Sequence, residues 1–204
     1  MDRIFWDSFQ LPEPKYKLGV QEKTHAKQVA EMMRKLDDIL DQECPDWVLV
    51  HGDTNSTLSG AIAACKRANI KVAHVEAGLR SFDRRMPEEL NRILTDQVSS
   101  LLFAPTPEAK KQLLREGVSP SKIRVVGNTI EDILKIRIGE AEAKSDVLSR
   151  YQLSAHEFVL LTVHRQENTD DLVRLVEILN AIFDSAEKFK LKVIFPVHPR
   201  TRNR

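Results

Sequence analysis

The amino-acid sequence predicts an α/β protein built on parallel β-sheets and divided into two domains. Short apolar segments alternate with longer segments of helical periodicity, and the apolar segments 47–50 and 71–75 run straight into polar clusters. Strands that are apolar throughout and joined by helices indicate a parallel sheet covered on both faces. The carboxyl ends of such strands form one edge of the sheet, and ligands bind there in open α/β folds.

The first domain opens with an irregular segment, followed by a long helix over about 21–42. The apolar residues of this helix recur at steps of three and four: Val29, Met32, Met33, Leu36 and Leu40. The alternation that follows predicts strands at 47–51, 71–75, 101–104 and 123–126, and helices at 55–68, 87–99, 107–116 and 129–138. Pro107 suits a first helical turn, and Gly117 stands where a helix C-cap is expected.

The second domain is predicted to begin after a charged helical linker at 140–156, which separates domain 1–139 from domain 157–204. A strand at 158–163, a helix at 170–188 and a strand at 191–197 follow. Two strands and one helix cannot bury both faces of a sheet. We therefore expect the second domain to be incomplete, the first to lack its initial strand, and the chain to be a fragment of a longer protein.

The composition argues against several classes of function. A formal net charge of +1 and 6% aromatic residues offer neither a basic field nor a stacking surface for nucleic acid. Cys44 and Cys65 lack the spacing of a zinc site, so no metal is expected. No glycine-rich dinucleotide motif or P-loop occurs, so no cofactor is expected either. Without a secretory leader or a run near the ~20 apolar residues of a membrane span, the protein is predicted to be soluble and cytoplasmic, with no membrane partner.

Asp53 is the first candidate for catalysis. It follows a strand and Gly52, and Thr54, Asn55 and Ser56 open the next helix. Asp, Thr, Asn and Ser are all favoured N-cap residues, so helix capping accounts for one of the four. The N–H groups of a helix N-terminus also attract anions, phosphate included. Four such residues in a row exceed what capping needs, which favours a ligand site.

Glu76 is the second candidate, at the mouth of the next apolar strand. A carboxylate there is partly desolvated, as suits a general acid or base. The structural alternative is an ion pair with Arg80 or Arg84. His74, two residues earlier, is interpreted as a core histidine whose hydrogen bonds are satisfied.

Glu88 and Glu89 are further candidates, in the first turn after Pro87, where the helix dipole favours negative charge. Glu88 could instead form an i, i+4 pair with Arg92. Pattern alone slightly favours a structural role. The position of this segment, directly after the loop that leaves Glu76, shifts the balance towards catalysis.

Two clusters of histidine and arginine end the strands of the second domain. His164 and Arg165 follow the first strand, and His198 and Arg200 follow the second. Arginine can bind a diphosphate with two parallel hydrogen bonds. A single histidine at a strand end is usually structural, but two such clusters on adjacent strands favour contact with a ligand.

Five segments of the sequence form a set: HGDT at 51–54, HVEAGLR at 74–80, PEELNR at 87–92, GNT at 127–129 and HRQEN at 164–168. Together they resemble the non-hydrolysing UDP-N-acetylglucosamine 2-epimerases. They occur in the order of that family and with compatible spacing, from about residue 20 onward. Hydrolysing relatives tend to carry a glycine pair after the glutamate, whereas Ala77 and Gly78 follow it in this sequence. The non-hydrolysing branch is therefore favoured.

The resemblance implies two Rossmann-like domains of GT-B type with the active site in the cleft between them, and assembly as a homodimer. It also implies interconversion of UDP-N-acetylglucosamine and UDP-N-acetylmannosamine without NAD. UDP would leave by elimination to give 2-acetamidoglucal, and would then add back with the other configuration at C2. The long helix at 21–42 could form the dimer interface, or it could simply face the core.

The resemblance assigns roles to particular residues. Asp53, Glu76 and Glu88 match the catalytic carboxylates, and His164 matches a histidine that contacts the diphosphate. The expected substrate-binding set comprises His51, Thr54, Arg80, Glu89, Asn91, Arg92, Arg165, Glu167, Asn168, His198 and Arg200. Those of the set between positions 80 and 92 are expected to shape the loop and hold the charges apart. Which carboxylate removes the C2 proton is left open.

The sequence also departs from the family pattern. The Gly-Thr-Arg-Pro-type loop near the start of family members and their later Ser-Gly-Gly segment do not occur in it. We therefore expect the isolated chain to be inactive. The alternatives are a hydrolysing epimerase or a glycosyltransferase on the same fold, or a non-catalytic fragment that binds a nucleotide sugar.

Overall fold

The structure, a computed structural model, describes residues 6–7 and 9–202. The side chains of residues 166, 167, 199 and 200 are outside this description, so the predicted roles of Glu167 and Arg200 fall outside it as well. The chain forms two compact units, one up to Ile133 and one from Leu134 onward. No helix in the described part of the chain combines the length and the apolar character needed to cross a membrane.

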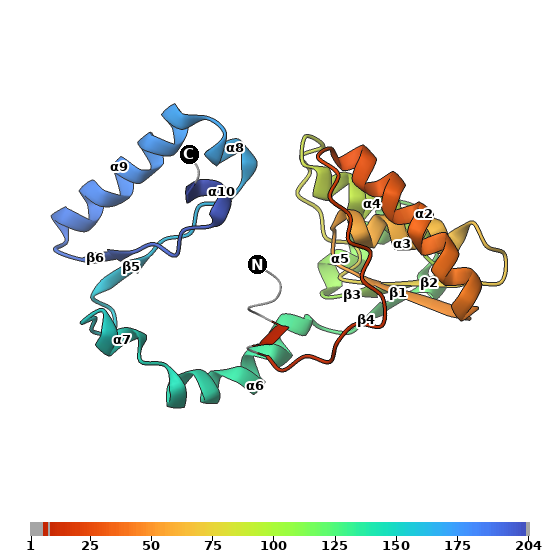
Figure 1. Ribbon diagram of the computed structural model, residues 1–204, viewed down its shortest axis with the longest axis horizontal. Helices are drawn as coiled ribbons and strands as arrows, with labels where there is room; N and C mark the ends of the chain where they lie inside the picture. The colour runs from red at the N-terminus through yellow and green to blue at the C-terminus, as the bar shows by residue number, and fades with distance from the viewer. Residues whose placement is uncertain (1–5, 8, 203–204) are drawn as a thin grey trace. The chain divides into compact units, whose positions relative to one another are not determined.

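The first unit contains the predicted parallel sheet, and its four strands lie in the order β1-β2-β3-β4. Its strands are β1 (Trp47–His51), β2 (Lys71–Val75), β3 (Leu101–Ala104) and β4 (Ile123–Val125). Its helices are α2 (His25–Glu43), α3 (Asn55–Cys65), α4 (Pro87–Val98) and α5 (Pro107–Arg115), with a short 3₁₀ turn η1 (Pro120–Lys122) before β4. Figure 1 shows α2, α3 and α4 gathered on one side of this sheet.

The sequential strand order puts α3, α4 and α5 on the same face of the sheet. A right-handed crossover that always steps to the next strand in one direction returns over the same side each time. On that face Val50, His74, Leu102 and Ile123 share one row of the register and all are buried. This row joins the two apolar clusters of the unit to the strand ends that carry the polar residues.

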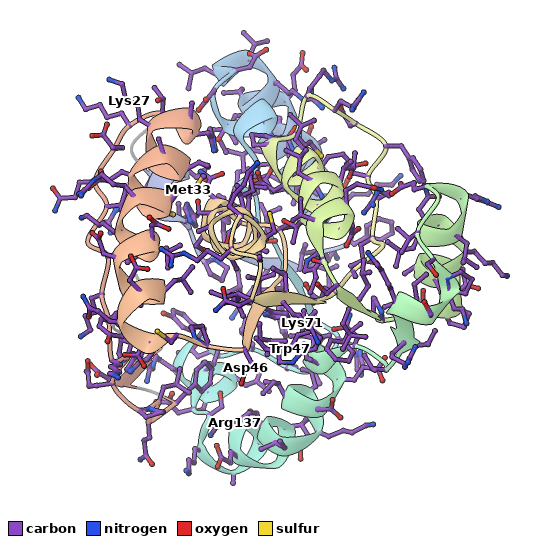
Figure 2. The ribbon with its side chains drawn as sticks, turned by 90° about the vertical axis from the view of Figure 1, so that its right-hand side faces the viewer. Lys27, Met33, Asp46, Trp47, Lys71 and Arg137 are labelled. Carbon is purple, nitrogen blue, oxygen red and sulfur yellow. The ribbon has the colours of Figure 1, made fainter. Side chains whose placement is uncertain are left out.

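The opposite face of the sheet is only partly covered, so the prediction of coverage on both faces is wrong for the described residues. Leu49 points to that face and is 66% exposed, while Ala73 beside it is buried. At the amino ends of the strands, the Lys71 ammonium lies 5.4 Å from the centroid of the Trp47 ring (Figure 2). The strand order explains this partial coverage, because the crossover helices α3, α4 and α5 all pack on the other face of the sheet.

The helix predicted over 21–42 begins later than expected. Thr24 caps it, accepting a hydrogen bond from the Lys27 N–H, and the helix ends at Glu43 before Cys44 in a left-handed conformation. Its inner side packs on α3, with Leu40 in the same apolar cluster as residues of α3. The interpretation of this helix as core-facing is therefore confirmed.

The second unit pairs two short parallel strands, β5 (Phe158–Leu160) and β6 (Lys192–Ile194), joined through α9 (Leu172–Lys188). The turns α8 (Gln166–Thr169) and α10 (Pro199–Arg202) follow the two strands, and α7 (Val147–Arg150) precedes them. Both strands are shorter than predicted, and Pro196 has no N–H with which to extend β6. Leu161, Val163 and Leu175 form the apolar core of the unit.

The stretch predicted as linker is largely helical, as expected, but without a break after 138. The helix predicted over 129–138 corresponds to α6 (Thr129–Lys144), which continues beyond residue 138 into the charged segment. The boundary between the two units, between Ile133 and Leu134, falls inside this helix.

Candidate active site

Asp53 lies in the turn between β1 and α3, at the carboxyl edge of the sheet. Gly52 before it has φ of +72°, a left-handed conformation that suits glycine. The Asp53 carboxylate pairs with the Arg92 guanidinium from α4, and Nδ2 of Asn91 donates to the Asp53 carbonyl at 2.8 Å. Two residues of α4 therefore fix both the side chain and the backbone of Asp53.

Glu76 follows β2 directly and lies against the Asp53 turn. It has φ of +71°, unusual for a residue with a side chain, and its side chain is 28% exposed. Its Oε1 is 3.7 Å from Nε2 of His51, and a Cβ built on Gly52 would lie 3.6 Å from its Oε2. The predicted site residues His51 and Glu76 are thus brought together, and a Cβ at position 52 would make only an ordinary contact with Glu76.

Glu88 and Glu89 occupy the first turn of α4, which has Pro87 at its start. Glu88 is half-buried and lines the same pocket as Asp53. Glu89 is buried and accepts hydrogen bonds from the Ser81 N–H at 2.8 Å and the Phe82 N–H at 3.0 Å. Burial raises the pKa of Glu89, but these hydrogen bonds outweigh it, so the net pKa lies below the ordinary value of 4.5.

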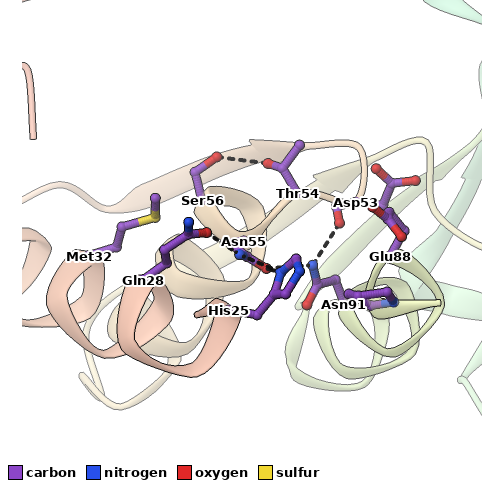
Figure 3. A pocket seen from close by; sticks show the side chains of 10 residues that line it. His25, Gln28, Met32, Asp53, Thr54, Asn55, Ser56, Glu88 and Asn91 are labelled. Carbon is purple, nitrogen blue, oxygen red and sulfur yellow. Dashed lines mark hydrogen bonds between the residues drawn. The ribbon is translucent and has the colours of Figure 1, made fainter. Parts of the chain in front are cut away.

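A pocket of about 330 Å³ opens at this edge of the sheet (Figure 3). It is formed by the N-terminal ends of α2, α3 and α4, and its lining residues are His25, Gln28, Met32, Asp53, Thr54, Asn55, Ser56, Pro87, Glu88 and Asn91. Thr54 caps α3 by accepting from the Thr57 N–H, so the capping interpretation of this residue is confirmed. Helix N-termini that face a pocket suit an anionic ligand.

Sequence reasoning missed the contribution of α2 to this pocket. Nδ1 of His25 lies 3.0 Å from Nδ2 of Asn55, which donates to Oε1 of Gln28 at 2.7 Å. His25, Gln28 and Met32 stand at steps of three and four along α2, so these three residues share one helix face. That spacing was the available signal, but only the packing of α2 on α3 turns the face towards Asp53.

Arg80 and His74 are held inside the unit by ion pairs and hydrogen bonds. The Arg80 side chain is 2% exposed and pairs with Asp96 at 2.7 Å and with Glu116. These partners replace the pairing of Arg80 with Glu76 that was considered as an alternative. His74 is fully buried with both ring nitrogens in hydrogen bonds, which confirms its interpretation as a satisfied core histidine.

In the second unit, the two predicted strand-end histidines come together. The ring centroids of His164 and His198 are 5.8 Å apart. The Arg165 carbonyl accepts from the N–H groups of Asn168 and Thr169 and so starts the turn after β5. Within the described residues, the buried Oδ1 of Asn168 has no hydrogen-bond partner. Such an unpaired acceptor calls for an explanation, and a ligand is one.

The sequence matches known proteins over its whole length. The profile of a family described as UDP-N-acetylglucosamine 2-epimerase matches residues 1–204. A UDP-N-acetylglucosamine 2-epimerase of Methanocaldococcus jannaschii is 48% identical over 206 residues, which cover 100% of this chain and 56% of that protein. A UDP-2,3-diacetamido-2,3-dideoxy-D-glucuronate 2-epimerase of Pseudomonas aeruginosa is 43% identical and covers 99% of this chain and 56% of that protein. The chain therefore spans about half the length of these relatives.

Solved structures give the same result for the fold. The crystal structure of the M. jannaschii UDP-GlcNAc 2-epimerase in complex with UDP-GlcNAc and UDP has a TM-score of 0.91, and the match covers 100% of this chain and 56% of that one. A UDP-N-acetylglucosamine 2-epimerase from Rickettsia bellii has a TM-score of 0.88 at 33% identity, with 100% and 52% coverage. These neighbours confirm the predicted α/β fold of GT-B type with parallel sheets.

Proposed function

Since this chain belongs to the UDP-N-acetylglucosamine 2-epimerase family, we propose that the whole protein interconverts UDP-N-acetylglucosamine and UDP-N-acetylmannosamine without a redox cofactor. The observation that carries the proposal is the meeting of the Asp53 and Glu76 turns at one sheet edge, with Glu88 on the same pocket as Asp53. Acid/base chemistry on a sugar needs such a set of carboxylates.

The proposed reaction is an elimination followed by an addition. A carboxylate removes the proton from C2, the electron pair of the C2–H bond forms the C1=C2 double bond, and the C1–O bond breaks with its electrons leaving on UDP. UDP then attacks C1 of the 2-acetamidoglucal, and C2 receives a proton on the opposite face. Inversion at C2 requires groups on two faces of the ring, which is why more than one carboxylate is needed. Asp53, Glu76 and Glu88 are the proposed acid/base set, without assignment of the C2 base.

The remaining residues are proposed to support these carboxylates or to hold the diphosphate. His51 faces Glu76, while Asn91 and Arg92 hold Asp53. These contacts support a positioning role for them, and the same holds for Arg80 and Glu89. Thr54, at the N-terminus of α3, is proposed to offer a donor to the substrate.

The second unit is proposed to bind the nucleotide diphosphate. The closeness of the His164 and His198 rings supports this role. Among the described residues, the unpaired Oδ1 of Asn168 can only accept, so it suits a donor group of the nucleotide and not its phosphates. Arg165 and Glu167 are proposed as further contacts from their motif, and Arg200 from its place in the predicted strand-end cluster. Homodimer assembly, a cytoplasmic location and inactivity of the isolated chain stay predictions.

Proton NMR of UDP-N-acetylglucosamine with the full-length gene product in deuterated buffer tests the proposal. We expect UDP-N-acetylmannosamine to appear with deuterium at C2, because the proton that returns comes from solvent. Free N-acetylmannosamine together with UDP would instead indicate a hydrolysing epimerase. A folded full-length protein that produces neither a new sugar nor exchange at C2 contradicts the proposal.

One observation favours a second substrate. The P. aeruginosa relative named for a UDP-diacetamido-glucuronate is 43% identical over 99% of this chain. The same experiment with UDP-2,3-diacetamido-2,3-dideoxy-D-glucuronate separates the two: the true substrate shows the larger kcat/KM.

A further inference from the structure

A cluster of four ionisable side chains, three buried and one half-buried, lies behind the two turns that carry Asp53 and Glu76. Asp96, on α4, has no exposed side-chain surface; its Oδ1 is 2.7 Å from Nδ1 of His74, and its Oδ2 is 2.7 Å from the Arg80 guanidinium. Arg80 also pairs with Glu116 at the end of α5. Isolated buried charges are costly, so each member of such a cluster needs partners that satisfy it.

The hydrogen bonds of this cluster place a proton on Nε2 of His74. Nε2 is 2.9 Å from the Gly52 carbonyl oxygen, which can only accept, so Nε2 carries a proton. Nδ1 of the same ring lies 2.7 Å from Oδ1 of Asp96. Asp96 also pairs with the Arg80 guanidinium and accepts from the Gly78 N–H at 3.1 Å. Each polar atom of the His74–Asp96 pair therefore has a partner.

The contacts of the pair join the two catalytic turns. Through its ring, His74 holds the Gly52 carbonyl, one residue before Asp53. Asp96 holds the Gly78 N–H, two residues after Glu76. A continuous series of hydrogen bonds thus connects the two strand ends. It runs from the Gly52 carbonyl through the side chains of His74 and Asp96 to the Gly78 N–H.

Both turns have a backbone that needs such support. Gly52, Glu76 and Gly78 have φ of +72°, +71° and +83°. A left-handed conformation is unfavourable for a residue such as Glu76 and persists only where surrounding contacts enforce it. The hydrogen bonds from Asp96 and His74 fall on the residues that flank the two carboxylates, where they oppose relaxation of either turn.

We propose that His74 and Asp96 are positioning residues that hold the carboxylates of Asp53 and Glu76 at a fixed separation for proton transfer. They do not touch the substrate; they act through the backbone of Gly52 and Gly78. The kinetic part of this inference rests on the proposed epimerase function. Neither residue belongs to the motif-derived set of catalytic and binding residues.

Two variants of the same residue test the link to the Asp53 turn in the full-length protein. The carboxamide of glutamine reaches the position of Nε2, so His74→Gln keeps a donor for the Gly52 carbonyl. The carboxamide of asparagine reaches the position of Nδ1, so His74→Asn keeps the donor to Asp96 but releases Gly52. We expect kcat to fall on the order of 10²-fold in His74→Asn with KM nearly unchanged, and by about threefold or less in His74→Gln.

Glu116→Gln is the matched control. It removes a carboxylate from the same Arg80 guanidinium but bonds to neither turn. We expect its kcat to stay within about twofold of the wild type, even where its thermal stability drops as much as that of the His74 variants. Equal losses of kcat in His74→Gln and His74→Asn, or no loss in either, would overturn the inference.

Amide hydrogen exchange of the folded proteins supplies a readout that needs no activity. His74→Asn should speed exchange at Asp53 and Thr54 relative to His74→Gln. On the wild type, nitrogen NMR should detect a proton on Nε2 of His74, which donates to the Gly52 carbonyl. A wild type without epimerase activity would refute the proposed function only, while a His74 ring with an unprotonated Nε2 would refute this inference whether or not the His74 variants fold.

Discussion

Asp53 and Arg92 form an ion pair that joins two elements 39 positions apart in the sequence. Asp53 follows β1, and Arg92 lies in the second turn of α4, on the same helix as Glu88. Arg92 also lies 3.6 Å from Oε2 of the buried Glu89. One guanidinium therefore sets the direction of a proposed catalytic carboxylate and is itself held by a second, buried one.

Loss of this ion pair should impair catalysis more than folding. In Arg92→Gln, the Asp53 carboxylate loses the partner that orients it, so we expect kcat to fall by roughly 10- to 100-fold. Steady-state kinetics of the full-length protein measure this change. Arg67→Gln is the matched control, because Arg67 is 23% exposed against 20% for Arg92 and pairs with Asp37 and Asp41 away from the pocket. A similar loss in both variants contradicts an orienting role for Arg92.

Removal of the charge of Glu89 should destabilise the loop after Glu76. In Glu89→Gln, the amide oxygen can accept from only one of the Ser81 and Phe82 N–H groups and the amide NH2 faces the other, so we expect a loss of about 2 kcal/mol in the free energy of unfolding. Urea denaturation measures it. Amide exchange should rise at Ser81 and Phe82 before it rises elsewhere in the first unit; exchange that rises evenly throughout contradicts a local role.

The same substitution predicts a pH dependence. The pKa of Glu89 is lowered in the folded state from its ordinary value of 4.5, so the folded protein holds this proton less tightly than the unfolded chain. Its stabilising contribution is full above the unfolded pKa and is lost as the pH falls through the folded pKa. The stability difference between wild type and Glu89→Gln should therefore be constant near neutrality and shrink below about pH 4.5. A difference that grows on acidification contradicts the assignment.

A methyl group at Gly78 should unfold the turn. A Cβ there would lie 2.4 Å from the Ala109 carbonyl oxygen, at φ of +83°, so Gly78→Ala combines a clash with backbone strain. We expect Gly78→Ala to lower the free energy of unfolding by about 3 kcal/mol or more. Gly117→Ala is the control, since Gly117 has φ of +85° with nothing within 4 Å and should cost about 1 kcal/mol. If Gly78→Ala and Gly117→Ala have equal midpoints in thermal denaturation, the close contact with Ala109 does not destabilise the protein, and the prediction is wrong.

The histidine pair of the second unit should affect nucleotide affinity. If His164 and His198 bind the diphosphate, His164→Asn and His198→Asn should each weaken UDP binding by about tenfold, because the shorter side chain leaves no donor at the position of Nε2. Isothermal titration calorimetry on the full-length protein measures the affinity. His156→Asn, a change of the same kind in the loop before β5, should leave it unchanged. Unaltered UDP binding in both strand-end variants contradicts the assignment.

The sequence by itself determined the order of the elements and the edge at which the polar residues gather. The strands at 47–51, 71–75 and 101–104 are correct in type and bounds, because the local pattern of apolar residues sets strand and helix. Parallel strands place their carboxyl ends at one edge, so Asp53 and Glu76 could be predicted to meet. The strands of the second unit were predicted less well: β5 and β6 are shorter than predicted, since within the described part of the chain each has only the other as a partner.

Only the tertiary structure decided which charge meets which. Local spacing allowed an ion pair between Glu88 and Arg92, but Arg92 pairs with Asp53 and Glu89. Spacing also allowed an ion pair between Glu76 and Arg80, but Arg80 pairs with Asp96 and Glu116. Likewise, His25 joins the pocket only because α2 packs on α3. The physical reason is that periodicity depends on residues a few positions apart, whereas an ion pair depends on crossovers that bring distant residues within about 4 Å. The sequence pattern predicts that a carboxylate lies at a strand end, whereas the packing of the helices behind it determines which cation it pairs with.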